Sequence, residues 1–297
     1  MTTSDEHLMP TSPADASLEN LQEWVGRTAT VEDVLQGSSA QRLFAMLDRE
    51  DELPVVLPPL WHWLYFLSAP PTASIDADGH PRRGGFLPPV PLPRRMWAAG
   101  SLQWKIGNPL RIGETVRRDS RILSLTQKSG SSGDLIFVTV EHEIHNARGI
   151  ALTEHQDIVY RAAARLGGPS ARSFTHPGSA AWQRAIVPDE VLLFRYSALT
   201  FNAHRIHYDR PYATTIEGYP ALVVQGPLIA TLLADLARRV APGAAIRKFQ
   251  FKAVRPCFNG RPLRLHACPA PDSPGLILWA LDSDDHLAMQ ANCEFQT

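Results

Sequence analysis

The chain has 297 residues, of which 44% are hydrophobic and 20% are charged, a composition typical of a soluble globular protein with a sizeable core. Its 29 basic and 30 acidic side chains nearly cancel, which gives no reason to expect a nucleic acid or an anionic membrane as partner. No apolar run approaches the ~20 residues that a membrane span needs. The N-terminus lacks the features of a secretory or mitochondrial signal, so we expect a cytoplasmic protein.

The first quarter of the chain predicts little regular structure. Residues 1–16 are small and polar, which predicts a disordered leader. Two short helices are predicted next, over Leu18–Val25 and from about Ser39 to Asp48, because apolar side chains recur on one face. Ten of the 25 prolines lie in Pro54–Pro93, so this stretch is predicted to be mostly extended loop. Inside it, the aromatic cluster Trp61–Phe66 is expected to form a short buried element.

Strand patterns follow over Met96–Tyr160. Leu102–Ile106 alternates between apolar and polar residues, and Leu135–Ile144 begins as an apolar run and ends alternating. The serines and glycines of Lys128–Gly133 predict a turn between two strands. Residues 161–188 are small, polar and aperiodic, which is typical of a linker between domains.

One helix stands out in the second half, from Ala221 to about Val240. It ends with Arg238 and Arg239, whose charges suit the negative pole of a helix. A helix that is apolar on almost every side must be enclosed, and an antiparallel sheet wrapped around it would enclose it. The three cysteines form no CxxC pair, so neither a disulfide framework nor a zinc knuckle is indicated.

An internal repeat relates the two halves of the chain. Leu102–Gly113 aligns without a gap on Phe249–Gly260, with Gln, Lys, Pro and Gly in common and an aromatic residue before each Lys. We interpret this as a duplicated domain with a period of about 147 residues. The predicted organisation is a leader over 1–16, a first domain over 17–160, a linker over 161–188 and a second domain over 189–297.

The segment Phe194–Tyr212 is dense in polar side chains and allows three interpretations. It is a solvated loop, or a metal site built on the pair His204 and His207, or a site of acid/base chemistry by a histidine, whose ordinary pKa of ~6.5 suits proton transfer. Two histidines without a third ligand at a diagnostic spacing are a weak metal signal, so we predict no metal.

This segment resembles the MaoC-like enoyl-CoA hydratases and dehydratases. Tyr196–His207 is similar to their hydratase-2 motif, in which a catalytic Asp precedes the His by five residues, and Val224–Gly226 is similar to the His-Gly that begins their central helix. Phe249–Leu263 is similar to the strand pair that follows this helix. The first half resembles the FAS1-like dehydratase half of double-hotdog proteins at Trp61–Phe66, Pro93–Gly100 and Gln156–Arg161. Among these proteins, the mesaconyl-C4-CoA and itaconyl-CoA hydratases and the fungal mitochondrial 3-hydroxyacyl-thioester dehydratases are most similar.

The resemblance implies an α+β fold, a tandem (double) hotdog in which two antiparallel sheets each wrap around a long central helix. It implies a hydro-lyase that adds or removes water across the 2,3 double bond of a short branched or dicarboxylic enoyl-CoA, with mesaconyl-C4-CoA to citramalyl-CoA as the leading reaction. CoA is part of the substrate, so no separate cofactor is implied. The expected partner is therefore an acyl-CoA, and a homodimer of double-hotdog chains is compatible with the family.

The same resemblance assigns the catalytic residues. His207 would be the general acid/base, and the amide of Gly226, at the positive end of a helix dipole, would be the oxyanion donor. Asn202 occupies the place of the family's catalytic Asp; a carboxamide cannot take a proton at neutral pH, so Asn202 is expected to orient water or the imidazole. His207 then acts alone, or Asp209 or Glu217 contributes; we favour His207 with Asn202 positioning.

Substrate binding is expected at Arg205, Arg255, Tyr208 and Gln225. Either arginine would serve a free substrate carboxylate, or alternatively a structural or CoA-phosphate contact. Gln225 replaces the family's His, but the backbone amide beside it is the expected functional group. The repeat offset carries His207 onto Leu60, so the first half is expected to supply a pocket wall and no acid or base at the motif position.

Other functions stay open at this stage. A substrate of the itaconyl-CoA type, or a 3-hydroxyacyl thioester of fatty acid metabolism, would suit the same motifs. A hotdog thioesterase would need an acidic residue on or near the central helix, where the sequence offers only Asp235. A non-catalytic protein that binds acyl thioesters is the remaining alternative, for which Asn202 is the main argument.

Overall fold

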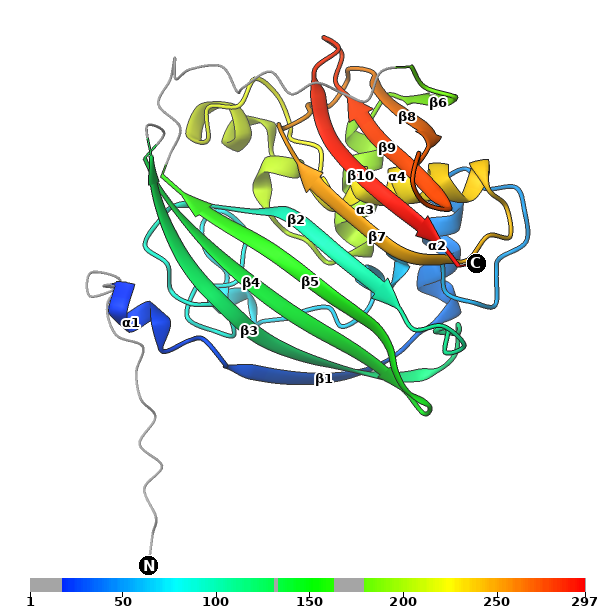
Figure 1. The fold of residues 1–297 in the computed structure, drawn as a ribbon. Coiled ribbons are helices and arrows are strands. Elements are labelled where there is room, and N and C mark those ends of the chain that lie inside the picture. The colour runs from blue at the N-terminus through cyan, green and yellow to red at the C-terminus, as the bar shows by residue number, and fades with distance from the viewer. Residues whose placement is uncertain (1–17, 131–132, 163–178, 297) are drawn as a thin grey trace, which may run out of the picture.

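The computed structural model describes residues 18–130, 133–162 and 179–296. Its main feature is one antiparallel sheet of ten strands in the order β1-β3-β4-β5-β2-β7-β10-β9-β8-β6 (Figure 1). The strands are β1 (Thr28–Val34), β2 (Arg94–Trp104), β3 (Thr115–Gly130), β4 (Gly133–Asn146), β5 (Gly149–Arg161), β6 (Trp182–Ile186), β7 (Ile246–Ala253), β8 (Leu263–Pro269), β9 (Gly275–Leu281) and β10 (Leu287–Phe295).

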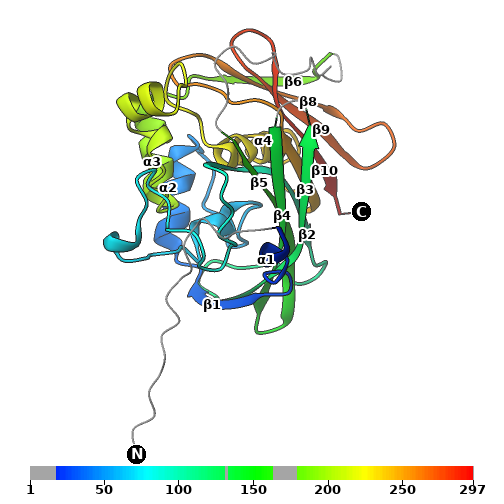
Figure 2. The same cartoon turned by 90° about the vertical axis from the view of Figure 1, so that its left-hand side faces the viewer.

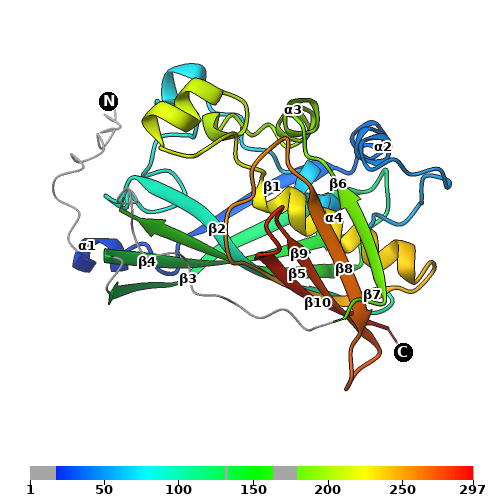
Figure 3. The same cartoon turned by 90° about the horizontal axis from the view of Figure 1, so that it is seen from above.

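The helices cover one face of this sheet, as Figures 2 and 3 show for α2, α3 and α4. They are α1 (Leu18–Gln22), α2 (Gly37–Met46), α3 (Glu190–Leu199) and α4 (Gly226–Val240), with the short turns η2 (Trp61–Leu64), η3 (Thr72–Ser74), η4 (Arg205–His207) and η5 (Tyr212–Ile216). Among the described residues, no helix combines the length and the apolar character that crossing a membrane requires.

The strand order reads alike from both ends of the sheet. From one edge the order is β1-β3-β4-β5-β2, and from the other it is β6-β8-β9-β10-β7, so each half repeats the same path. The halves join where β2 pairs antiparallel with β7, and Leu102 lies opposite Phe249. These two residues open the aligned sequence repeat, so a two-fold relation of the halves passes through this pair. Because β2 and β7 pair, the two expected sheets are one continuous sheet.

The central helix α4 packs against the second half of the sheet. Leu228, Leu232 and Leu233 are buried in the main core with side chains of β8 and β10. The helix begins at Gly226, five residues later than predicted, because Val223 bridges to Phe258 as extended chain and Pro227 suits the first turn.

The expectation of a long central helix in the first half is wrong. At the corresponding place between α2 and β2, the structure has Leu47–Pro93, where the described backbone forms only the turns η2 and η3. Its prolines lack the N–H groups that helical hydrogen bonds require. Trp61 and Tyr65 of this segment are buried members of the main core.

Several local predictions are confirmed. The two N-terminal helices correspond to α1 and α2, the aromatic cluster contains η2, and strands cover the predicted regions. The predicted linker is too long, because Trp182–Ile186 forms β6 and pairs with β8. The predicted leader and residues 163–178 of that linker lie outside the described residues.

Candidate active site

A cavity of about 890 Å³ opens on the helical side of the sheet and is lined from both halves of the chain. Such a volume is in the range of sites that bind small molecules and cofactors. The polar and glycine residues of its lining that matter below are Asp78, His80, Arg95, Tyr160, Asn202, His204, His207, Glu217, Gly226 and Arg255.

His207 lies in η4 and is buried against the start of α4. Its Nδ1 is 2.7 Å from the backbone carbonyl oxygen of Val223. A carbonyl oxygen only accepts hydrogen bonds, so Nδ1 carries the proton and donates, which leaves Nε2 with a free lone pair. Burial lowers the pKa of His207 to about 4, so the ring is neutral at pH 7. His207 is therefore held as a neutral base.

Gly226 lines the cavity at the first residue of α4. The N-terminal end of a helix carries a partial positive charge and backbone N–H groups that point outward from the axis. This is the placement that the sequence predicts for the oxyanion donor, and the donor role itself stays a prediction.

Asn202 also lines the cavity, in the loop between α3 and η4. Its Oδ1 accepts a hydrogen bond of 3.1 Å from the backbone N–H of His204. One acceptor of the carboxamide is thus engaged in holding the loop. The structure brings Asn202, His207 and Gly226 to the same cavity, as expected.

Three predicted substrate-binding residues lie elsewhere. Gln225 is buried with its Nε2 donating to the carbonyl of Leu193 and to Ser197, so its side chain fastens α4 to α3. Tyr208 is half exposed and its hydroxyl donates to a backbone carbonyl of the same loop. Neither Gln225 nor Tyr208 lines the cavity.

Arg205 is the third misplaced residue. Its guanidinium pairs with Asp209 at 2.7 Å and donates to the carbonyl of Ala77. Both Arg205 and Asp209 lie outside the cavity lining, which does not favour Asp209 as a proton-transferring partner. Arg205 and Asp209 are four residues apart in the chain and their charges neutralise each other, so neither charge is directed into the pocket.

Arg255 and Glu217 line the cavity, but each has a charged partner. Nη1 of Arg255 lies 3.7 Å from the Asp282 carboxylate, and Nε of Arg94 lies 3.1 Å from the Glu217 carboxylate. The ion pair between Arg94 on β2 and Glu217 joins the two halves beside the site.

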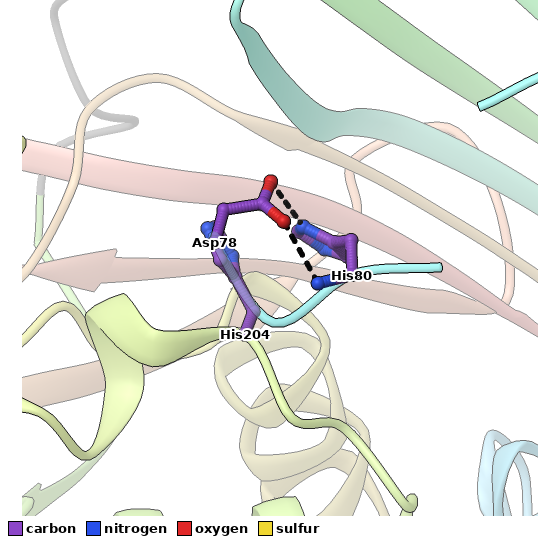
Figure 4. A group of neighbouring side chains, drawn as sticks. All are labelled: Asp78, His80 and His204. Carbon is purple, nitrogen blue, oxygen red and sulfur yellow. Dashed lines mark hydrogen bonds and ion pairs between the residues drawn. The ribbon is translucent and has the colours of Figure 1, made fainter. Parts of the chain in front are cut away.

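Sequence reasoning missed a group from the first half, Asp78 and His80 (Figure 4). Asp78 Oδ1 accepts from the backbone N–H of His80 at 2.8 Å, and Oδ2 lies 3.0 Å from His80 Nδ1. The ring of His80 packs on that of His204, with centroids 4.0 Å apart, and His204 meets His207 edge to face at 5.3 Å. The first half therefore supplies titratable side chains as well as a wall, although not at the motif position, where Leu60 stands.

A close backbone contact holds this loop on the second half. The backbone N–H of Arg205 donates to the carbonyl of Asp78 at 2.9 Å. Gly79, at φ +90°, approaches so closely that a Cβ there would lie 1.8 Å from the carbonyl oxygen of Ala203. The sequence signal was a glycine between an acid and a histidine, Asp78-Gly79-His80, in a stretch otherwise rich in proline.

Charge and burial set the protonation states of this cluster. Burial lowers the pKa of His204 to about 2, and the neighbouring His80 adds to the effect. Burial also lowers the pKa of His80, although Asp78 opposes the shift. Burial would raise the pKa of the Asp78 carboxyl, but the hydrogen bonds from the ring and the backbone N–H of His80 outweigh it and hold that pKa well below the ordinary range. The cluster is thus one carboxylate beside neutral imidazoles.

These three side chains are close enough to approach one ion, since their ligand atoms lie within 4.8 Å of one another. Both oxygens of Asp78, however, already accept hydrogen bonds from His80. His204 and His207 were first considered as a pair of metal ligands. In the structure His204 packs on His80, and Nδ1 of His207 donates to a backbone carbonyl, so the two histidines do not face one ion together. The arrangement fits a hydrogen-bonded network, and the absence of a required metal stays a prediction.

Comparisons with known proteins point to one enzyme family. Residues 60–259 match the family model of hydroxyacyl-thioester dehydratase type 2. The chain is 46% identical over 275 residues to mesaconyl-C(4)-CoA hydratase of Chloroflexus aurantiacus, covering 91% of this chain and 96% of that protein. It is 28% identical over 234 residues to the mitochondrial hydroxyacyl-thioester dehydratase type 2 of Schizosaccharomyces pombe, covering 70% and 77%.

Solved structures confirm the double hotdog fold. A MaoC-like dehydratase of Phytophthora capsici matches with a TM-score of 0.67 at 12% identity, covering 95% of this chain and 99% of that one. A double-hotdog protein of Mycobacterium tuberculosis matches with a TM-score of 0.59 at 13% identity, covering 95% and 97%.

Proposed function

Since the chain belongs to the hydroxyacyl-thioester dehydratase type 2 family and is a hydro-lyase, we propose that it hydrates a short dicarboxylic enoyl-CoA, with mesaconyl-C4-CoA to citramalyl-CoA as the leading reaction. The observation that carries the proposal is the neutral His207 imidazole beside the start of α4 in one cavity. The 46% identity to a mesaconyl-C(4)-CoA hydratase supports the choice of acyl group.

His207 Nε2 is the proposed carrier of the proton. As the oxygen of water bonds to the β-carbon, His207 takes a proton from it and returns that proton to the α-carbon. A positioned acid/base contributes about 10²- to 10⁴-fold in rate. Asn202, which lines the same cavity, helps to position the reacting groups.

Negative charge gathers on the thioester oxygen as the β-carbon is attacked. The Gly226 amide at the positive end of α4 is the proposed donor to that oxygen. A donor fixed before the reaction costs no reorganisation and contributes roughly 3 to 4 kcal/mol.

The free carboxylate of a dicarboxylic acyl group needs a cation in the pocket, and Arg95 meets this need. Arg95 lies on β2 opposite Tyr160, and both line the cavity. Its positive charge lowers the pKa of His80 and of His204, so it lies near the imidazoles. No carboxylate lies within 4.0 Å of Arg95 in the described parts of the chain. Arg95 thus replaces Arg205 as the expected carboxylate partner.

The competing thioesterase function needs an acidic residue near the start of the central helix, and Asp235 does not supply it. Asp235 is buried on α4 and pairs with Arg49, Arg184 and Arg239, with closest N–O distances of 3.0, 3.1 and 2.7 Å. It does not line the cavity. The absence of a separate cofactor, a cytoplasmic location and a homodimer of double-hotdog chains stay predictions.

A panel of enoyl-CoA esters tests the function. We expect the wild type to consume the enoyl absorbance of the dicarboxylic ester, and His207→Ala to lose about 10³-fold in turnover. His286→Ala, at a half-exposed histidine outside the cavity, is the matched control and should keep its activity. Release of free CoA thiol would instead indicate a thioesterase, and binding without turnover would indicate a non-catalytic protein.

A further inference from the structure

The proposed reaction leaves one acceptor unassigned. An attacking water has two protons; His207 takes one, and the second needs a hydrogen-bond acceptor that orients the oxygen lone pair toward the β-carbon. In the resembled motif a carboxylate occupies the position of Asn202. Here that side chain is an amide whose Oδ1 already accepts from the backbone of His204. The motif position therefore offers only the second lone pair of a neutral amide oxygen, a weaker acceptor than a carboxylate.

We propose that His80, held by Asp78 from the first half of the chain, is that second acceptor and acts as a catalytic residue on the same water as His207. This inference rests on the proposed hydratase function. Asp78 is a positioning residue, since it acts through His80.

Asp78 fixes the tautomer of His80. Its two oxygens face two nitrogens of His80, the backbone N–H at 2.8 Å and Nδ1 at 3.0 Å. An ionised carboxylate has no proton to donate, so Nδ1 must carry the hydrogen of this contact. The lone pair of the neutral ring is then on Nε2, where it can only accept.

Ring contacts connect this acceptor to His207 through His204. His80 and His204 are 4.0 Å apart between centroids, and His204 and His207 are 5.3 Å apart. All three histidines line the one cavity.

The docking of the loop gives this placement its rigidity. Gly79 touches the backbone of Ala203, and the carbonyl of Asp78 accepts from the N–H of Arg205. These contacts join the two residues that precede His80 to the loop that carries His207. A first-half side chain thus has a fixed position in the second-half site.

The step balances with both imidazoles neutral at the start. The water oxygen bonds to the β-carbon, one water proton passes to His207 Nε2, and the π electrons move toward the thioester carbonyl. The other proton stays on oxygen as the new hydroxyl and remains hydrogen-bonded to His80 Nε2. His207 then delivers its proton to the α-carbon, and the dehydration runs through the same steps in reverse.

Asp78→Asn tests the role of the tautomer. The amide oxygen should stay with the backbone N–H of His80, which turns the amino group toward Nδ1 and forces the ring hydrogen onto Nε2. We expect kcat to fall about 100-fold or more, with the Kd of a saturated acyl-CoA analogue changed less than about threefold. Asp76→Asn is the matched control, because Asp76 belongs to the same turn, is half exposed and does not line the cavity.

The double variant Asp78→Asn with His207→Ala decides whether the two groups share one water. Since they act as a unit, the double variant should lose no more turnover than the poorer single variant. Retention of kcat within threefold in Asp78→Asn, or multiplication of the two losses in the double variant, would overturn the inference. An inactive wild type on every enoyl-CoA would instead overturn the proposed function, so the two failures are distinguishable.

Discussion

The two halves of the sheet share one strand order but present different side chains to the helical side. In the second half, Leu265 on β8, Ala280 on β9 and Met289 on β10 lie side by side and are buried in the main core with α4. In the first half, the matching strands β3, β4 and β5 carry a polar row, Ser120, His142 and Glu154. The same path of strands therefore carries an apolar row in one half and, beside the apolar cluster that contains Ile122 and Val140, a buried polar row in the other.

What covers each half explains the difference. A helix such as α4 satisfies its own backbone and offers apolar side chains, so the strands beneath it are apolar. The proline-rich segment of the first half instead brings His62 and Trp63, which bind the Glu154 carboxylate at 3.0 and 2.9 Å. Burial alone would raise the pKa of Glu154, but His62 lowers it to about 2. Buried polar groups are tolerated when each finds partners, and this leaves room for a cavity.

The largest expected effect comes from separating the first-half loop from the second half. Gly79→Ala would place a Cβ 1.8 Å from the carbonyl oxygen of Ala203, so the loop must move. Since a displacement of about 1 Å can cost about 100-fold in rate, we expect kcat to fall by at least that factor. Gly84→Ala is the matched control, because Gly84 has the same φ of +90° but its Cβ would meet its nearest atom at 3.9 Å. Equal losses in both variants would indicate backbone strain alone.

A smaller effect is expected from the first-half cation. Arg95→Gln should lower kcat/KM for a dicarboxylic enoyl-CoA about 10- to 100-fold, as expected for one charge-assisted hydrogen bond. An enoyl-CoA without the free carboxylate should be hydrated within about threefold of the wild-type rate. Arg121→Gln, exposed on β3, removes the same charge and should change neither value. A parallel loss with both substrates would show that Arg95 does not read the carboxylate.

The pH dependence sharpens the comparison further, because the base belongs to the second half. The pKa of His207 is lowered to about 4, so its neutral form persists down to about pH 5. We expect kcat/KM to stay level between pH 7 and 5 and to fall as pH drops through about 4. Rates at constant ionic strength, with brief exposure to acid, measure this profile. A fall centred near the ordinary ~6.5 of histidine would mean that burial does not set the base.

The smallest effect is expected from metal removal. Both oxygens of Asp78 accept from His80, so the first-half cluster functions as a hydrogen-bonded pair in our proposal. Dialysis against a chelator should leave turnover within experimental error. Loss of activity that returns on adding a divalent ion would assign Asp78, His80 and His204 to an ion instead.

Local sequence patterns predicted much of the fold. Alternating and apolar runs predicted the strands, apolar density predicted the enclosed helix, and the repeat predicted the doubling. The start of α4 and the strand β6 were misjudged, because neither the Val223 bridge nor the pairing of Trp182–Ile186 with β8 is a local property. Pairing partners far apart in the chain decide where such elements begin and end.

The sequence by itself, through its resemblance to a family, placed Asn202 and His207 in one motif and Gly226 at the start of the central helix, because short spacings survive folding. The sequence could not show that Arg205 lies outside the pocket, since the pairing of Arg205 with Asp209 depends on the loop conformation. Only the tertiary structure brought Asp78 and His80 to His204, across more than a hundred residues of chain. The physical reason is that the site is assembled where the halves dock, and the close Gly79 contact with Ala203 exists only in the folded molecule.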